Sequence, residues 1–280
     1  MKKIRIVITL LFLVQFAFTQ KAITVVKNGT GRPIIFLPGF TAPGSVWDET
    51  IKNLNGSYES YIVSYAGFNG LEPIGTPWYD AIKKQLVAYI KNEHLSNVTI
   101  IGHSMGGNLA IDVAAELPGQ IVGLILIESI PCMRDLMMPG VPASNLQYDS
   151  PYNNQLLAMS DGDFKKMATE MSQNMTNVKS KAEILTNWSI KADRKTYVYG
   201  YTDLLNLDLR DKLTAINVHT LIVGASSPSA EIERASFEKQ YANLKEKEIL
   251  CVEGSKHFIM FDQPEWLNTQ VNKYLKQYAQ

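Results

Sequence analysis

Cysteine is scarce in this sequence, and its scarcity excludes two kinds of stabilised scaffold. The 280 residues contain two cysteines, Cys132 and Cys251, whereas a domain built on disulfides needs several. Each lies in or beside a different apolar run, so we expect two separate buried thiols, with a disulfide between them left open. Cysteine and histidine do not cluster at the spacing of metal ligands, so we expect no metal and no cofactor.

An excess of charge of either sign is also lacking. The chain has 27 Lys and Arg against 27 Asp and Glu, a formal net charge of zero. Without net charge there is no overall field that would attract nucleic acid or an anionic membrane surface. We therefore expect a small-molecule partner and no nucleic acid, and the oligomeric state is left open.

The first twenty residues differ from the rest. Lys2, Lys3 and Arg5 precede a mostly apolar run over residues 6–18. This run is too short to span a bilayer comfortably, but its length and basic flank are typical of a secretory signal. We predict a signal peptide over residues 1–20 and a secreted or periplasmic protein without a stable membrane anchor after cleavage. An uncleaved anchor or a buried first strand is the alternative interpretation.

From residue 21 onward, short apolar runs alternate with amphipathic stretches. This alternation predicts an α/β fold, a mostly parallel sheet flanked by helices, in one large domain with an insertion. We expect strands at residues 23–26, 34–37, 61–65, 98–101, 124–127, 220–223 and 249–252. We expect helices at residues 46–54, 79–93, 105–117, 230–242 and 265–278.

The alternation fails in one long segment. Between Pro131 and about Lys195 there is no apolar run of strand length. We therefore predict a helical cap over residues 131–195, inserted between two parts of the core at residues 21–130 and 196–280. Seven of the ten methionines fall within this cap.

The methionines of the cap have two interpretations. Phe164, Met167, Met171, Met175 and Val178 recur at spacings of three and four, which marks one face of a helix that packs on the core. Alternatively, part of this stripe lines an adaptable apolar substrate pocket. The residues expected in that pocket are Met133, Met137, Met138, Met167 and Met171. Both interpretations can hold together.

A short segment combines small residues with a serine: Gly102-His103-Ser104-Met105-Gly106-Gly107. It follows the apolar run at residues 98–101 and precedes a helical stretch, so the serine lies on a sharp strand-to-helix turn. A nucleophile at such a turn has a strained backbone and crowded neighbours, which small residues two positions before and after it relieve. Ser104 is therefore the candidate nucleophile of a hydrolase.

A serine hydroxyl needs a base to take its proton, and the chain offers four histidines. His257 follows the last expected strand, on a loop at the carboxyl end of the sheet, where a base can reach Ser104. His94 is expected on the polar side of a helix, and His219 at the start of a buried strand. His103 is expected to point away from Ser104 and to shape the turn.

Residues 29–280 resemble the α/β-hydrolase superfamily, in particular exported bacterial members with a helical cap. The matching segments are Ile-Ile-Phe-Leu-Pro-Gly-Phe (34–40) with Trp47, Ala-Gly-Phe (66–68), residues 102–107, Asp-Leu-Arg (208–210) before residues 220–224, His-Phe-Ile-Met (257–260) and Pro-Glu-Trp (264–266). The resemblance implies the α/β-hydrolase fold and an oxyanion hole made by the backbone N–H groups of Phe40 and Met105. Pro38 stands where many members have histidine, and a hole built from backbone groups loses little by this.

The acid of the triad departs from the usual pattern of the superfamily. The usual aspartate comes a few residues after the strand at 220–223, where this chain has Ser227. Some members place the acid one strand earlier, and here Glu128 directly follows the strand at 124–127. The resemblance therefore favours Glu128 as the acid, with Glu231, Asp262 or a weakened dyad as alternatives.

Together these residues predict a serine hydrolase that acts on carboxylic esters with an apolar portion through an acyl-enzyme. Ser104 attacks the ester-like substrate, His257 carries the proton and Glu128 orients the imidazole. Thioesterase, lactonase, C–C hydrolase or acyltransferase activity would use the same residues and stays open. A ligand-binding protein without turnover is the alternative from another class. Ser104 disfavours dehalogenase and epoxide hydrolase activity, because those members use an aspartate nucleophile.

Overall fold

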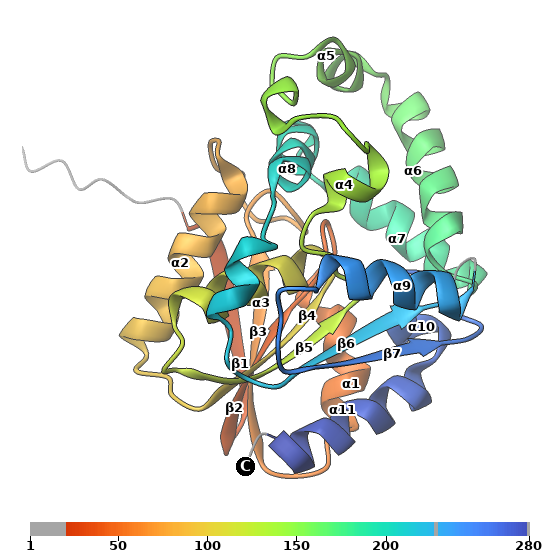
Figure 1. The fold of residues 1–280 in the computed structure, drawn as a ribbon. Helices are drawn as coiled ribbons and strands as arrows, with labels where there is room; N and C mark the ends of the chain where they lie inside the picture. Colours follow the sequence, from red (N-terminus) through yellow and green to blue (C-terminus); the bar gives the residue numbers. More distant parts are fainter. Residues whose placement is uncertain (1–20, 227–228, 279–280) are drawn as a thin grey trace, which may run out of the picture.

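A seven-stranded sheet runs through the middle of the molecule in the order β1-β3-β2-β4-β5-β6-β7 (Figure 1). The computed structural model describes residues 21–226 and 229–278. Strand β1 pairs antiparallel with β3, and all other neighbours are parallel. The strands are β1 (Ile23–Gly29), β2 (Arg32–Leu37), β3 (Tyr58–Tyr65), β4 (Val98–His103), β5 (Ile121–Ile127), β6 (Thr220–Ala225) and β7 (Lys247–Val252). The predicted mostly parallel sheet is thus confirmed.

Every predicted strand lies within an observed one, and most observed strands are longer at one end. Strand β2, for example, begins at Arg32 and β7 at Lys247. In β1, β2 and β7 the added residues include Lys27, Arg32 and Lys247, because the hydrogen-bonded ladder there continues into polar residues that hydrophobicity does not mark.

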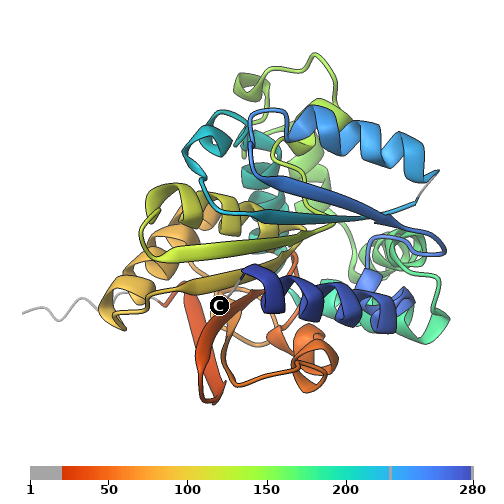
Figure 2. The ribbon, with the colours of Figure 1, turned by 60° about the horizontal axis from the view of Figure 1, so that its bottom comes forward.

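Helices cover both faces of the sheet, as predicted. Within strand β2, Ile35 and Leu37 pack on one face and Ile34 and Phe36 on the other, because successive side chains of a strand alternate. Helices α2 (Trp78–Asn92), α3 (Met105–Glu116) and α9 (Ala230–Gln240) contribute to the first layer. Helices α1 (Asp48–Lys52), α10 (Ile259–Asp262) and α11 (Pro264–Tyr278) lie on the second, with α11 in front in Figure 2.

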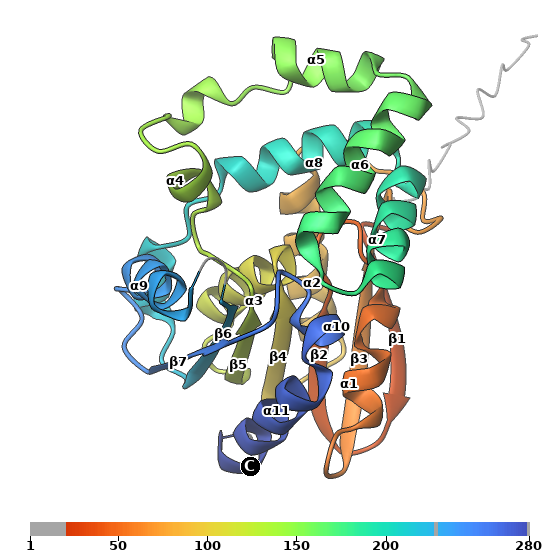
Figure 3. The ribbon, with the colours of Figure 1, turned by 90° about the vertical axis from the view of Figure 1, so that its right-hand side faces the viewer.

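The long segment between β5 and β6 is helical wherever it has regular structure. Its helices are α4 (Met133–Met137), α5 (Pro151–Ala158), α6 (Asp161–Met175), α7 (Lys179–Lys191) and α8 (Arg194–Asn206). Figures 1 and 3 show these helices beyond the carboxyl ends of the parallel strands. Helix α8 continues past residue 195, the position where the sequence predicts the end of the cap.

The methionine stripe lies beside the buried face of α6. The buried residues of this helix are Phe164, Ala168 and Ser172, a spacing of four. Met171, by contrast, is partly exposed. Val178 lies outside α6, because the helix ends at Met175 and Val178 is the N-cap of α7. The structure thus confirms the stripe in part: Phe164 is buried and Met167 and Met175 pack against the core, whereas Met171 is exposed.

No helix in the described part of the chain is long and apolar enough to cross a bilayer. The predicted signal peptide at residues 1–20 lies outside the described residues. Cys132 and Cys251 are both unpaired, and Cys132 is buried.

Candidate active site

Ser104 lies on a sharp turn between strand β4 and helix α3. Its backbone has φ 54° and ψ −123°, a conformation that costs a non-glycine residue energy and persists only where the surroundings enforce it. The N–H of Ser104 donates to the carbonyl of Ile127 at the end of β5 (2.9 Å). The serine is thus held at the carboxyl edge of the sheet, next to the residue that follows β5.

The glycines around Ser104 are required by close backbone contacts. A Cβ on Gly102 would lie 2.4 Å from the carbonyl oxygen of Gly106, and a Cβ on Gly106 would lie 2.2 Å from that of Leu37. Both distances are far shorter than a van der Waals contact. The clashing atoms belong to the backbone, so they cannot rotate away as a side chain could. The turn that presents Ser104 therefore tolerates no side chain at these two positions.

Glu128 and His257 form a hydrogen-bonded pair beside this turn. Glu128 directly follows β5 with φ 49°, and its Oε2 lies 3.1 Å from Nδ1 of His257, on the loop after β7. Its Oε1 accepts a hydrogen bond from the N–H of Ala225 (2.6 Å). Since a carboxylate accepts, Nδ1 carries the proton and Nε2 of His257 is left as the basic nitrogen.

The other acid candidates have different surroundings. Glu231 is exposed at the start of α9. The carboxylate of Asp262 accepts hydrogen bonds from the Thr176 hydroxyl (2.6 Å) and from the N–H of Lys256 (2.8 Å). These two bonds fix the loop before His257. Ser227 lies outside the described residues.

His103, the residue before Ser104, is fully buried beneath the loop that carries His257. Its Nε2 donates to the backbone carbonyl of His257 (2.9 Å), and its ring packs against Phe258. Burial lowers the pKa of His103 well below its usual value, so its ring is neutral. A Cβ on Gly39 would lie 2.7 Å from Nδ1 of His103. His103 therefore joins the loop after β2 to the loop after β7.

The remaining two histidines lie away from Ser104. His94 is exposed just after α2. The ring of His219 stacks on Tyr278 at 3.7 Å, which gives it a packing role before β6.

Ser104, Glu128 and His257 line one cavity of about 280 Å³. Its other walls come from α3, α4, α8 and α9 and from the turn after β5. These wall residues are Met105, Asn108, Ser129, Ile130, Pro131, Met133, Leu136, Met137, Leu204, Leu207, Glu233, Ser236 and Phe237. We call this space the elbow cavity. It brings together three residues that the sequence places at the ends of three different strands.

A second, apolar cavity of about 500 Å³ lies among the helices between β5 and β6. Met137 lines both cavities, so the two are neighbours that share a wall. Met138, Met167 and Met171 line the second cavity, whereas Met133 lines the elbow cavity. All five methionines predicted for a pocket therefore line one of these two spaces.

Phe40 does not line the elbow cavity with its side chain. Its ring packs against Tyr197 (5.5 Å) and Tyr201 (5.9 Å), two residues that line the second cavity. Its backbone lies in the loop after β2, directly after Gly39. Met105 is the first residue of α3, so its N–H is one of those that have no partner within the helix.

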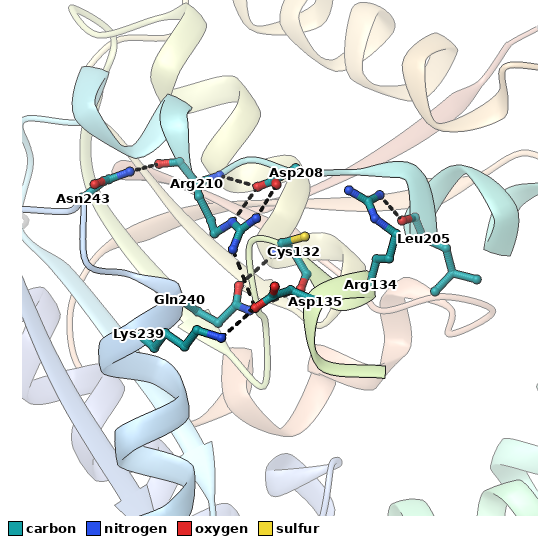
Figure 4. A network of polar contacts seen from close by, with 9 residues as sticks. All are labelled: Cys132, Arg134, Asp135, Leu205, Asp208, Arg210, Lys239, Gln240 and Asn243. Carbon is teal, nitrogen blue, oxygen red and sulfur yellow. Dashed lines mark hydrogen bonds and ion pairs between the residues drawn. The ribbon is translucent and has the colours of Figure 1, made fainter. Parts of the chain in front are cut away.

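A network of polar contacts ties α4 to the core (Figure 4). Asp135 of α4 pairs with Lys239 of α9 (3.0 Å) and with Arg210 (3.6 Å). Arg210 also makes a bidentate pair with Asp208 (2.8 and 2.6 Å). In addition, Gln240 of α9 bonds both the N–H and the carbonyl of Cys132, just before α4. The network fixes the helix whose Met133 and Met137 form part of the cavity walls.

Sequence reasoning missed Glu233 and Ser236, which line the elbow cavity from α9. With Phe237 and Gln240 they share one helix face at spacings of three and four, so the phase of α9 could have indicated them. No group of three or more His, Cys, Asp or Glu in the described ranges is placed to hold a metal ion.

Residues 34–270 match the sequence profile of the Alpha/beta hydrolase family. The pimeloyl-[acyl-carrier protein] methyl ester esterase of Legionella pneumophila (strain Paris) is 28% identical over 222 residues, 78% of this chain and 86% of that protein.

Two solved structures share the fold over most of their length. The esterase EaEST from Exiguobacterium antarcticum has a TM-score of 0.75 and 22% identity, and the match covers 91% of this chain and 96% of that one. The enol-lactonase from Burkholderia xenovorans LB400 has a TM-score of 0.72 and 12% identity, with 91% and 96% covered. At these identities the likeness shows a common fold and leaves the substrate open.

Proposed function

This chain belongs to the alpha/beta hydrolase family, and we propose that it is a serine hydrolase that cleaves carboxylic esters. The observation that carries the proposal is that Ser104, His257 and Glu128 line one cavity, with Nδ1 of His257 3.1 Å from the Glu128 carboxylate. A nucleophile, a base and an acid that orients the base are the groups that acyl transfer through serine requires.

In the first step, Ser104 Oγ attacks the ester carbonyl carbon while Nε2 of His257 takes the hydroxyl proton. Glu128 holds the Nδ1–H, which keeps Nε2 basic, and its charge stabilises the imidazolium that forms. The backbone N–H groups of Met105 and Phe40 donate hydrogen bonds to the carbonyl oxygen and stabilise the negative charge that develops on it. The N-terminal end of α3 adds a favourable dipole at Met105.

The imidazolium of His257 then gives its proton to the oxygen of the leaving alcohol as the C–O bond breaks, and the acyl group stays on Ser104. A water molecule enters, His257 takes one of its protons, and the hydroxide attacks the acyl carbon. The bond to Ser104 breaks, its oxygen regains the proton from His257, and a carboxylic acid leaves. The site is then restored.

The apolar part of the substrate is an acyl chain that occupies the second cavity. This assignment rests on the volume of about 500 Å³, on its largely apolar walls, and on Met137, which lines both cavities. A flexible thioether side chain at the shared wall can adjust to chains of different shape. In this proposal the helices between β5 and β6 act as a cap over Ser104.

Export is part of the same proposal. It rests on the basic residues Lys2, Lys3 and Arg5 followed by the apolar run at residues 6–18. N-terminal sequencing of the protein recovered from the periplasm or the medium would locate the cleavage site. Recovery of the uncleaved chain from the cytoplasm alone would overturn it.

The test of the function combines labelling with turnover. The purified protein is treated with a fluorophosphonate probe and assayed with p-nitrophenyl esters of increasing chain length. We expect labelling and hydrolysis, both lost in Ser104→Ala. The matched control is Ser96→Ala, an exposed serine in the turn before β4, which should behave as the unchanged protein. No labelling together with no hydrolysis of any ester would favour a ligand-binding protein of this fold.

A further inference from the structure

Apart from His257, the acidic and basic residues that line the elbow cavity are all carboxylates. Two carboxylates, Glu128 and Glu233, line it, and none of its described wall residues is a lysine or an arginine. Arg234 follows Glu233 in α9, but it is exposed and does not line the cavity. A concave site with charges of one sign and low-dielectric walls favours ligands of the opposite charge and repels those of the same charge.

The two carboxylates differ in what already binds them. Glu128 is occupied on both oxygens, by His257 at 3.1 Å and by the N–H of Ala225 at 2.6 Å. The side chain of Glu233 has no hydrogen bond or ion pair within the described ranges. Burial and the charge of Glu128 raise the pKa of Glu233 above its ordinary value, as expected for a carboxyl that lacks a cationic partner.

Two hydroxyl groups accompany Glu233 on the cavity wall. Ser236 lies one turn further along α9 and lines the same space. Ser129, directly after Glu128, lines it too, and its hydroxyl is buried without a hydrogen-bond partner in the described part of the chain. A buried hydroxyl without a partner is costly unless a ligand or water supplies one. The wall formed by α9 therefore presents the carboxylate of Glu233 and the serine residue Ser236 to a bound group.

The departure of the alcohol indicates which part of the substrate lies beside Glu233 and Ser236. His257 hands its proton to the alcohol oxygen, so the alcohol lies on the side of His257 and Glu128. Glu233 lines the same cavity as Glu128 and His257. The acyl chain, by contrast, extends past Met137 into the second cavity. The alcohol portion is thus the part that approaches Glu233.

We propose that Glu233 is a specificity-determining residue and that the preferred substrates are esters whose alcohol portion carries a cationic ammonium group. The inference rests on the proposed esterase function. The carboxylate of Glu233 pairs with the ammonium, while Ser236 lies one turn further along α9 on the same wall. Esters with an anionic alcohol portion are repelled by both carboxylates.

The test uses two butyrate esters of equal shape at pH 8. One is butyrylcholine and the other is 3,3-dimethylbutyl butyrate, in which a carbon replaces the ammonium nitrogen. We expect kcat/KM to be on the order of tenfold higher for the cationic ester. In Glu233→Gln this ratio should fall to within about twofold, whereas Glu231→Gln, an exposed glutamate of the same helix, should keep it.

A binding measurement separates the two proposals. Choline is titrated into Ser104→Ala protein by calorimetry, with and without Glu233→Gln. Binding that Glu233→Gln weakens about tenfold supports the cationic subsite even if no ester is hydrolysed. Hydrolysis of the neutral ester with a ratio near one, or a ratio that Glu233→Gln leaves unchanged, overturns the subsite and leaves the esterase intact. Absence of choline binding also overturns it.

Discussion

The buried imidazole of His103 donates its Nε2–H to the backbone carbonyl of His257 at 2.9 Å. The residue before the proposed nucleophile therefore holds the loop that carries the proposed base. Because His103 is neutral and fully enclosed, this contact acts through position and not through charge.

We expect His103→Phe to lower kcat about tenfold, because a base displaced by a fraction of an ångström transfers protons less efficiently. KM should change little, since His103 does not line the elbow cavity. His103→Gln, whose amide can place a donor near the position of Nε2, should restore most of kcat. Steady-state kinetics with thermal melts of both variants checks this. Equal losses in both variants would show that His103 only packs.

The acid of the triad can be tested by removing its charge. Glu128→Gln should lower kcat on the order of 10³–10⁴-fold, because the imidazole loses the group that fixes its tautomer. Glu231→Gln, an exposed carboxylate outside the cavity, should leave kcat within about twofold. The comparison is made with p-nitrophenyl butyrate at pH 8. Mild and equal effects at the two positions would contradict the assignment of Glu128.

Gly102 and Gly106, the two glycines around Ser104, should not tolerate an added methyl group. In Gly106→Ala the new Cβ would meet the Leu37 carbonyl at 2.2 Å, so the turn and the loop after β2 must move apart. We expect a loss of about 2 kcal/mol or more in the free energy of unfolding, measured by urea denaturation. Gly119→Ala has no atom within 4 Å of its Cβ and should be nearly neutral. Similar midpoints for both variants would argue against the clash.

The ion pair of Asp208 and Arg210 should make stability depend on pH. The Arg210 guanidinium holds the pKa of the Asp208 carboxyl below its ordinary value. A lowered pKa stabilises the fold above the ordinary carboxyl pKa of about 3.9, and this contribution is lost as the pH falls through the lower value of the folded state.

Asp208→Asn should therefore lower Tm by about 2 °C at pH 7, and the difference from the unchanged protein should narrow towards pH 3. Glu170→Gln removes the same charge from an exposed position on α6 and should show neither effect. Thermal melts between pH 3 and pH 7 give the comparison. A difference that is constant over this range would mean that the charge of Asp208 is not involved.

Filling the second cavity should shorten the acyl chain that the protein accepts. Met167→Trp places a larger side chain among its walls, so hydrolysis of p-nitrophenyl octanoate relative to the acetate should fall on the order of tenfold. Ile184→Trp adds the same ring to an exposed position on α7 and should keep the ratio. An unchanged ratio in Met167→Trp would place the acyl chain elsewhere.

The sequence predicted much of this site because its chemistry depends on residues at the ends of strands. Parallel strands end at the same edge of a sheet, so the order of the strands could bring Ser104 and His257 together, whereas the resemblance to the superfamily was needed to favour Glu128 among the acids. The order of the strands could not predict Glu233, because whether a helix residue faces a cavity depends on how the helix packs. Glu231, two residues earlier, has the same charge and points to solvent.

The sequence by itself determined the alternating strands and helices, the glycine-flanked serine turn and the helical segment between β5 and β6. These follow from hydrophobic periodicity and from backbone geometry, which are local properties. Only the tertiary structure decided the contact of Glu128 with His257, the hold of His103 on the loop after β7, and the carboxylate of Glu233 in the elbow cavity. Each depends on distances between residues far apart in the chain, which packing sets and local sequence does not encode.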